Sequence, residues 1–415
     1  MTETSLSDLT RSFARIGILS FGGPAAQIAL MHRELVDEKQ WVTEKEYLSA
    51  LSFCMLLPGP EAMQLATWIG WRAHGTLGGL IAGGLFVLPG ALIVLALSMI
   101  YATWGELPLV AALFTGVQAA VLAVVVEALL RVSKRALKTR AHWIVASLAF
   151  AALFLFATPF PVVILAAALW GFVSTTAPHS RNPSPAPWRQ SLQAAAIWGA
   201  VWLLPLLLIT QFAPTILADI ALFFSKLALL TFGGAYAVLT WMAQDVVQQK
   251  QWLTLPQMMD GLGLAETTPG PLILVTEFVG FLAAAKQGVW MGLAGAAITL
   301  WMTFAPCFLW IFAGAPWIAR LTAAPRLAGA LHGITAAVVG VIANLSLWFA
   351  AHVLFATVTP FSAGPLQLIL PDPTSLRPLP AALALLAAYL LLRRHWPLPY
   401  VLGLSAAVTA ALAAF

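Results

Sequence analysis

Three glutamates lie within or beside long apolar stretches of this chain, where a charge is costly. Glu61 directly follows Pro58-Gly59-Pro60, and Glu266 and Glu277 flank a second Pro-Gly-Pro at 269–271. A charged side chain at the centre of an isolated membrane helix costs about 2.5–3.5 kcal/mol, and burial favours the protonated form of a carboxyl group. Each of the three is therefore a candidate for carrying a proton, with a structural ion pair as the alternative.

Helix breakers interrupt the same apolar stretches. FGGP at 21–24 and FGGA at 232–235 precede the two Pro-Gly-Pro motifs at the same distance. Such motifs do not continue a regular helix, because proline lacks an amide donor and restricts the residue before it. Unpaired amides at membrane depth cost several kcal/mol each, so broken backbone occurs there only inside protein or along a wet cavity. Helix N-termini at such breaks suit an anion, and close helix packing or a kink is the alternative.

The candidate binding set consists of the breakers and the polar or charged residues next to them. In the first half of the chain it comprises Arg15, Ser20, Gly22, Gly23, Pro58, Gly59, Pro60, Glu61 and Gln64. In the second half it comprises Lys226, Thr231, Gly233, Gly234, Pro269, Gly270 and Pro271. For Arg15, which precedes its FGG motif by six residues as Lys226 does, a structural ion pair is the alternative. Glu127, followed closely by Arg131 and Lys134, predicts a pair at a helix end.

These motifs belong to an internal repeat. Residues 15–60 align with 226–271 without a gap, and fifteen of the forty-six positions are identical. The identities include Lys39-Gln40-Trp41 and its counterpart at 250–252, together with both Pro-Gly-Pro motifs. A register of this length indicates a duplication. Two of the differences fall at the motifs themselves: the second copy has Ala235 in place of Pro24, and Leu272 follows its Pro-Gly-Pro where Glu61 follows the first.

The composition places the repeat in a lipid bilayer. The chain of 415 residues is 61% hydrophobic and 9% charged, whereas a soluble domain has about 25% charged residues. We therefore expect an all-α polytopic membrane protein with about thirteen membrane segments. They fall near 13–32, 48–70, 76–102, 107–130, 142–157, 160–174, 191–210, 215–242, 257–283, 289–312, 327–356, 378–392 and 397–414. The net charge is +5. The Lys and Arg residues stand in short loops, so they indicate the orientation of the chain in the membrane rather than nucleic-acid binding.

Loop charges predict the orientation. The basic loops at 131–142 and 179–190 should be cytoplasmic, which puts the N-terminus inside and the C-terminus outside. Lys286 and Arg377 are exceptions on the outer side. The second repeat then begins outside, so the halves are inverted, as in many secondary transporters. The expected division is an N-terminal repeat (1–176), a Pro/Ser/Arg-rich linker (177–190) and an inverted C-terminal repeat (191–415).

At these residues the chain resembles the chromate ion transporter family. SFGGPAAQIALMHRELVDEKQWVTEKEYLSALSFCMLLPGPEAMQLATWIGW and GGLIAGGLFVLPG (78–90) are similar to its N-terminal signature. LTFGGAYAVLTWMAQDVVQQKQWLT and GLAETTPGPLIL are similar to its C-terminal one. The resemblance covers nearly the whole chain. It implies inverted homologous halves in the bacterial inner membrane and export of chromate, hence chromate resistance.

Other functions are weighed against this one. Sulfate or another oxyanion is an alternative substrate, because amides and Arg recognise charge and shape. A membrane enzyme is disfavoured, since the sequence has no GxGxxG in a βαβ setting, no HExxH and no haem- or cluster-type cysteines. Cys54 and Cys307 predict two small buried apolar side chains, and we expect no cofactor and no metal. The coupling ion, the direction of flux, the oligomeric state (a homodimer is one alternative) and whether the broken segments span or re-enter are left open.

Overall fold

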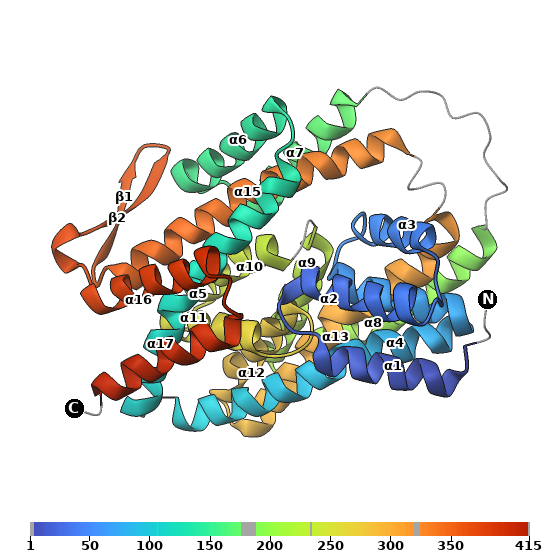
Figure 1. The fold of residues 1–415 in the computed structure, drawn as a ribbon, viewed down its shortest axis with the longest axis horizontal. Helices are drawn as coiled ribbons and strands as arrows, with labels where there is room; N and C mark the ends of the chain where they lie inside the picture. Colours follow the sequence, from blue (N-terminus) through green and yellow to red (C-terminus); the bar gives the residue numbers. More distant parts are fainter. Residues whose placement is uncertain (1–3, 106, 176–187, 233–234, 319–323, 414–415) are drawn as a thin grey trace.

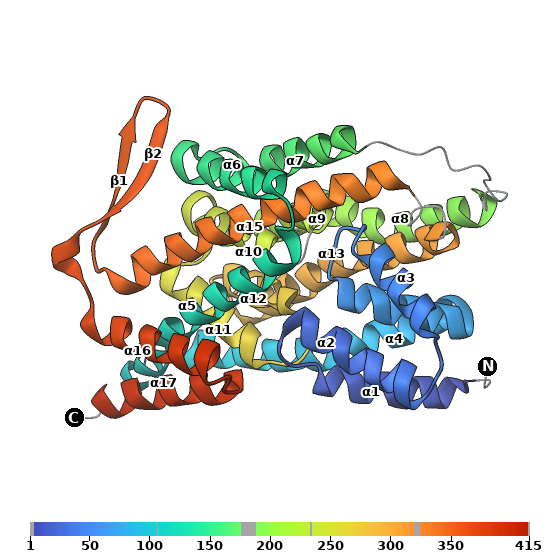
Figure 2. The ribbon, with the colours of Figure 1, turned by 45° about the horizontal axis from the view of Figure 1, so that its top comes forward.

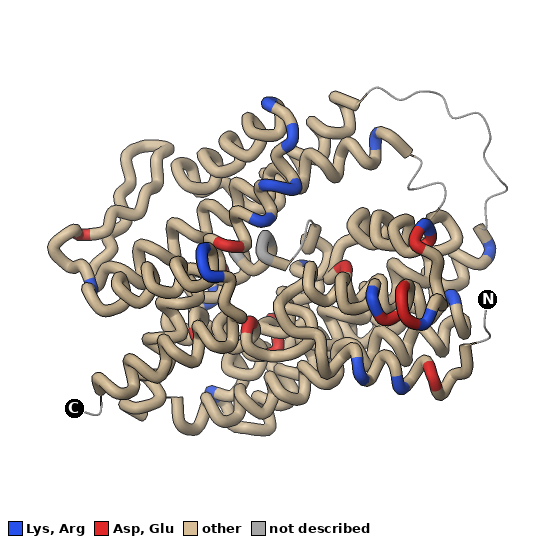
Figure 3. Tube along the Cα trace, in the orientation of Figure 1, with Lys and Arg blue, Asp and Glu red and all other residues tan. Residues whose placement is uncertain are grey.

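The computed structural model describes residues 4–105, 107–175, 188–232, 235–318 and 324–413, and these form a largely helical molecule (Figure 1). The termini lie at opposite ends of its long axis, and most helices run roughly along that axis (Figures 1 and 2). Charged residues gather near helix ends and connections, while long stretches of helix carry none (Figure 3). This distribution is typical of a protein whose solvent is lipid.

The first half contains eight main elements. They are α1 (Leu6–Leu19), α2 (Gly23–His32), the π-helical turn η1 (Arg33–Glu38), α3 (Glu44–Cys54), α4 (Glu61–Trp104), α5 (Pro108–Ala136), α6 (Arg140–Phe156) and α7 (Phe160–Ser174). Helix α8 (Trp188–Phe212) follows the predicted linker, of which residues 177–187 lie outside the described ranges and 188–190 already belong to this helix.

The second half repeats this order and adds a hairpin. Its helices and turns are α9 (Thr215–Leu230), α10 (Ala235–Gln244), η2 (Asp245–Gln249), α11 (Leu255–Thr267), η3 (Leu272–Leu274), α12 (Val275–Ala285), α13 (Val289–Gly314), η4 (Ala315–Trp317), α15 (Pro325–Leu354), η5 (Pro373–Ser375), α16 (Pro378–Ala388), η6 (Tyr389–Arg393) and α17 (Leu398–Ala413). Strands β1 (Val358–Ala363) and β2 (Leu366–Pro371) pair in antiparallel register. Sequence reasoning expected helices alone and missed this exposed hairpin.

Local backbone geometry recurs between the halves. Each repeat has a π-helical turn at the same place, followed by a glutamine with a positive φ (53° at Gln40 and 52° at Gln251). A threonine then caps the next helix through a capping box, Thr43 for α3 and Thr254 for α11. Because the shared residues adopt the same unusual conformations, the structure supports the duplication read from the sequence.

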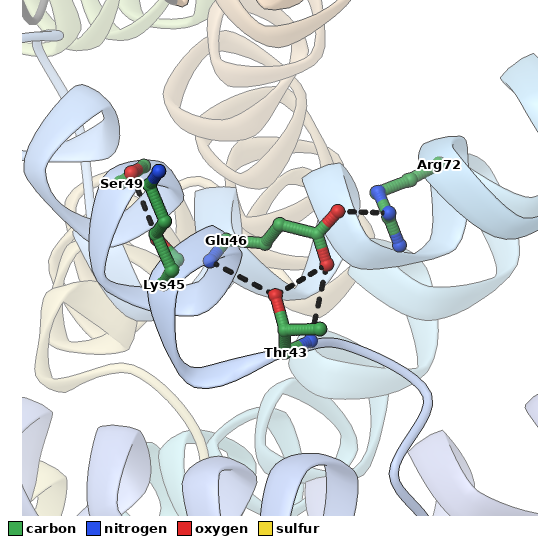
Figure 4. Close-up of polar contacts among 5 residues, drawn as sticks. All are labelled: Thr43, Lys45, Glu46, Ser49 and Arg72. Atoms are coloured by element: carbon green, nitrogen blue, oxygen red, sulfur yellow. Dashed lines mark hydrogen bonds and ion pairs between the residues drawn. The ribbon is translucent and has the colours of Figure 1, made fainter. Parts of the chain in front are cut away.

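The broken segments double back. In the first repeat, Arg72 near the end of the first arm of α4 pairs with Glu46 near the start of α3 (Figure 4). In the second, Lys286 after α12 donates to the Gln251 carbonyl just before α11 (3.4 Å). Arg15 of α1 likewise lies 3.4 Å from Glu34, which follows α2. The first FGG motif and both Pro-Gly-Pro motifs are therefore the tips of helical hairpins.

A second sharp bend follows each hairpin. Gly75, with φ +60°, turns α4 back on itself, so that a Cβ on Gly70 would lie 2.2 Å from the Gly78 carbonyl oxygen. Gly288, with φ +118°, does the same between α12 and α13, where a Cβ on Gly295 would lie 2.4 Å from the Gly280 carbonyl oxygen. Only glycine allows these backbones to touch.

Helix lengths separate spans from hairpins. Among the described residues, five helices are long and apolar enough to cross a membrane: Glu61–Trp104, Pro108–Ala136, Trp188–Phe212, Val289–Trp317 and Pro325–Leu354. Helix α2 has 10 residues and α3 has 11, about half the length that a bilayer requires. Four of the predicted segments (13–32, 48–70, 215–242 and 257–283) are each broken into two helices at their motifs.

The two halves exchange helices at their interface. Helix α15 packs against α6 and α7, while α5 packs against α16 and α17. Glycines allow the close approaches on both sides, since a Cβ on Gly116 would lie 2.1 Å from the Ser405 carbonyl oxygen and one on Gly171 2.1 Å from that of Gly329. This reciprocal packing holds the repeats together around the hairpin tips.

Candidate functional site

The two Pro-Gly-Pro tips meet the other repeat in crossed pairs. The amide of Gly59, in the first Pro-Gly-Pro, donates to the carbonyl of Thr231 before the second FGG motif (2.7 Å). The amide of Gly270, in the second Pro-Gly-Pro, donates to the carbonyl of Ser20 before the first FGG motif (2.9 Å). We call these two hydrogen bonds the clasps. Each clasp joins one repeat to the other, so it brings the Pro-Gly-Pro of one repeat against the residue before the FGG motif of the other.

The tip glycines have a steric reason to be glycine. Gly59 has φ +123° and Gly270 φ +91°, a region that other residues rarely adopt. A Cβ on Gly59 would lie 2.7 Å from Cys307 Sγ and from Gln64 Nε2. Gly90 of α4 leaves the same kind of room for the second tip, because its Cβ would lie 2.2 Å from the Pro269 carbonyl oxygen.

Two buried glutamines hold the tip carbonyls. Gln64 donates to the Pro58 carbonyl (2.7 Å), and Gln27 donates to the Gly270 carbonyl (2.6 Å) and the Ser20 carbonyl (3.2 Å). The Oε1 atoms of both glutamines are buried and have no hydrogen-bond partner among the described residues. A hydrogen-bond donor placed beside either oxygen would be favourable, since an unsatisfied buried polar atom costs about 1–3 kcal/mol.

The breaks place helix N-termini next to the clasps. Helix α2 begins after Gly22, α4 after Pro60 and the η3–α12 segment after Pro271. The first amides of a helix lack intrahelical partners and carry the positive end of its dipole. Ser20 and Thr231, predicted as ligands, donate their hydroxyl protons to the carbonyls of Ile16 and Leu227, so their main chains rather than their hydroxyl donors serve the clasps.

The predicted cations lie outside the clasps. Arg15 is largely exposed and pairs with the buried Glu34 at 3.4 Å, the arrangement of the structural alternative. Lys226 lies with its Nζ 5.5 Å from the ring centre of Trp241, a cation–π contact. Sequence reasoning did not identify Glu34 as the partner of Arg15. Gly233 and Gly234, also predicted as ligands, lie outside the described residues.

The three candidate glutamates occupy different environments. Glu61 is partly buried in the first turn of α4, directly at the first tip. Glu266 is buried at the end of α11, three residues before the second tip. Glu277 is buried in α12, and its Oε2 has no hydrogen-bond partner among the described residues. Glu61 directly follows its tip in the first turn of α4, whereas Glu277 lies in the first turn of α12, beyond η3.

Asp260 is a buried carboxylate that sequence reasoning missed. Its Oδ2 accepts from the Tyr101 hydroxyl (2.7 Å) and its Oδ1 from Gln118 Nε2 (2.7 Å). Tyr101 lies on α4 and Gln118 on α5, so the carboxylate ties α11 to two helices of the other repeat. An aspartate within the apolar segment 257–283 was the available signal, as was Gln27 within 13–32.

The open end of the hairpin formed by α3 and the first arm of α4 carries a carboxyl group with a shifted pKa. Partial burial of Glu46 raises its pKa, but the Thr43 hydroxyl and amide and the Arg72 guanidinium outweigh this and hold the pKa below its ordinary value (Figure 4). Among the other sequence predictions, Glu127 pairs with Arg131, and Cys54 and Cys307 are both buried free thiols.

The site as a whole is suited to hold an anion. Converging helix N-termini supply amide donors without a fixed positive charge, and glutamines fix the tips that present them. Glu61 competes for one of these N-termini, because a carboxylate there interacts favourably with the helix dipole. The geometry thus combines an anion site with a group able to take up a proton.

Comparison with known proteins identifies the family. The sequence profile described as "Chromate transporter" matches residues 7–172 and 218–411. A "Chromate transport protein" of Pseudomonas aeruginosa is 34% identical over 343 residues, which cover 81% of this chain and 79% of that protein. A "Chromate transport protein" of Cupriavidus metallidurans is 30% identical over 341 residues, covering 81% of each chain.

A "Probable chromate transport protein" of Synechococcus elongatus is 32% identical over 348 residues, which cover 82% of this chain and 83% of that protein. No solved structure matches the chain. The profile spans both repeats and includes the tips, and its members are membrane transporters rather than enzymes. The chain therefore belongs to the chromate transporter family.

Proposed function

We propose that this protein is a secondary transporter that exports chromate from the cytoplasm across the bacterial inner membrane and so confers chromate resistance. The observation that carries the proposal is the pair of crossed clasps, because each brings the Pro-Gly-Pro tip of one repeat against the segment before the FGG motif of the other. The names of the similar proteins supply the substrate. Two inverted repeats around a central site are the architecture of many secondary transporters.

The proposed orientation follows from the loop charges. The α5–α6 connection, rich in Lys and Arg, faces the cytoplasm, which puts the N-terminus inside and the C-terminus in the periplasm. The hairpins of the first repeat (1–176) then enter from the cytoplasm, and those of the second (191–415) enter from the periplasm. Lys286, an exception to the charge rule, donates to the Gln251 carbonyl at the mouth of its hairpin.

The proposed binding set is the tips themselves. Backbone amides at Gly22, Gly23 and Glu61 in the first repeat, and at Leu272 after the Pro-Gly-Pro of the second, take the oxyanion, with Gln64 and Gln27 holding the tips in place. Arg15 and Lys226 add positive charge nearby but are engaged with Glu34 and Trp241. Each clasp is one backbone hydrogen bond, worth about 1 kcal/mol net, so it can open and close in a transport cycle.

Coupling to protons is proposed to run through Glu61. When ionised, its carboxylate occupies the α4 N-terminus and repels a second anion; when protonated, it leaves the amides to the oxyanion. The second repeat has Leu272 at this position, so only one tip carries the switch. Glu266 and Glu277 are further candidates for the proton path, and exchange with another anion is the alternative driving force.

A sulfate carrier or exchanger is the second candidate function. Helix amides recognise a tetrahedral anion through its charge and size, and nothing in the described tips distinguishes chromium from sulfur. Sulfate should therefore compete with chromate.

The test is chromate accumulation in everted membrane vesicles with an imposed pH gradient. We expect accumulation by the wild type that depends on the gradient, and accumulation by Glu61→Gln that no longer responds to it. The matched control is Glu44→Gln, at an exposed glutamate in the first turn of α3. Absence of chromate flux, with robust sulfate flux, would favour the second candidate; a gradient response unchanged by Glu61→Gln would remove this residue from the coupling.

A further inference from the structure

A polar cavity of about 240 Å³ lies against Gly22, at the tip between α1 and α2. It is lined by Gly22 at the tip, Glu266 at the end of α11, Glu127 and Arg131 on α5, and His395 and Trp396 between η6 and α17. The cavity therefore connects the clasp region with the basic end of α5.

A larger cavity, of about 1000 Å³, lies beside α15 of the second repeat. Its lining includes Trp241 of α10, Lys250 after η2, Asn344 and Trp348 of α15, and the turn at 157–160 between α6 and α7. The β1–β2 hairpin lines it as well.

The duplication relates the two cavities. Helices α5 and α15 both begin at a proline, and from there eight of 29 aligned positions are identical. In this alignment Asn344 corresponds to Glu127 and Trp348 to Arg131. The α6–α7 turn of one cavity and the η6–α17 turn of the other also occupy equivalent places, each against the exchanged helix. The cavities are thus equivalent spaces on opposite repeats.

The two cavities carry different side chains at the positions where α5 and α15 align. The first cavity has the Glu127–Arg131 ion pair, with side chains that are 31% and 42% exposed. The second has a neutral amide and an indole at those positions, and its charged lining residues Asp245 and Lys250 come from η2 and the residue after it. An exposed ion pair is worth at most about 1 kcal/mol. An arriving dianion can therefore displace the carboxylate, since guanidinium binds tetrahedral oxyanions with paired hydrogen bonds.

We propose that the first cavity is the loading site for the oxyanion and that Arg131 binds it there by exchanging Glu127 for the substrate. The second cavity is the release end of the same path, where the equivalent position has no guanidinium. This inference rests on the proposed transport function, and it adds a binding residue that the motifs did not indicate. Glu127 acts as an internal competitor that keeps the affinity moderate.

The experiment measures the initial rate of chromate uptake into everted vesicles as a function of chromate concentration. The variants are Arg131→Gln and Glu127→Gln. The matched controls are Arg33→Gln and Glu38→Gln, which break the exposed pair on η1, whose atoms lie 3.6 Å apart. Protein abundance in the vesicles normalises each rate.

The two substitutions should act in opposite directions. Arg131→Gln should raise the half-saturating chromate concentration about ten-fold, and Glu127→Gln should lower it about three-fold, because the guanidinium loses its competitor. Both controls should stay within about two-fold of the wild type.

Three results would count against the proposal. Equal changes in the same direction would indicate a purely structural ion pair, and values within the range of the controls would overturn the loading site. In both cases the wild type still transports chromate, so the proposed function stands. A wild type without chromate flux would instead overturn the proposed function, and the loading site for chromate with it.

Discussion

The replacement of Gly59 by alanine tests the crossed clasp most sharply. Gly59 has φ +123°, and a Cβ there would lie 2.7 Å from Cys307 Sγ and Gln64 Nε2, closer than Cβ contacts occur. The backbone strain alone costs about 1–3 kcal/mol. Relief of the contacts must shift the tip and weaken the 2.7 Å hydrogen bond to Thr231, adding about 1 kcal/mol.

A matched glycine separates strain from contact. Gly288 has φ +118°, and nothing lies within 4 Å of its Cβ position. Gly288→Ala should therefore carry the same backbone strain without disturbing a tip. A loss of about 1.4 kcal/mol corresponds to a factor of ten, so Gly59→Ala should lower the initial rate of chromate uptake at least about ten-fold, while Gly288→Ala stays within about two-fold.

The assay is uptake into everted vesicles at equal protein abundance, together with the thermal unfolding midpoint of the purified variants in detergent. The double variant Gly59→Ala/Cys307→Ala should recover part of the rate, because it removes the Sγ atom from one of the two contacts. Equal rates for Gly59→Ala and Gly288→Ala, at similar midpoints, would refute the reasoning that the tip contact matters for transport.

Three further predictions concern carboxylates that are buried or held in ion pairs. Asp260→Asn should lower the unfolding free energy by about 1–3 kcal/mol, since an amide can accept from only one of the two donors that the carboxylate satisfies; an unchanged detergent unfolding midpoint would contradict this. Arg15→Gln should destabilise the protein more than Glu34→Gln, because it leaves a carboxylate that is 1% exposed without its cation, and the order of the two midpoints decides. The pKa of Glu46 is depressed, so its contribution to stability is complete above its unfolded pKa of about 4.3 and is lost as pH falls through the lower folded value. Glu46→Gln should therefore flatten the loss of stability in this acidic range, and an equally steep loss would speak against a stabilising ion pair between Glu46 and Arg72.

The sequence predicted the repeat and its breakers because these depend on local chemistry. Proline and glycine restrict the backbone wherever they stand, and KQW with its following threonine forces the same turn at Gln40 and Gln251. The identities between 15–60 and 226–271 therefore indicated equivalent hairpins before their geometry was known.

The crossed arrangement of the tips could not be predicted in the same way. The contact between Gly59 and Thr231 joins residues far apart in the chain, and no periodicity specifies it. The pairing of Arg15 with Glu34 was likewise hidden, because it depends on how α1 and α2 fold back on each other. Asp260 was missed because its partners come from α4 and α5 rather than from its own segment.

The exposed β1–β2 hairpin shows a different limit. Its residues follow a long apolar helix, and its turn depends on Gly364, which has φ +59°. Residues 358–371 lie between two predicted apolar segments, and a two-stranded unit has a weak sequence signal.

The central claim is tested most directly by chromate flux in vesicles that contain only the purified protein and lipid. The interior should accumulate chromate when a pH gradient is imposed, sulfate should reduce this flux, and Gly59→Ala should reduce it at least about ten-fold, the factor that corresponds to about 1.4 kcal/mol. Absence of chromate flux under a pH gradient and also with sulfate on the opposite face would contradict the account.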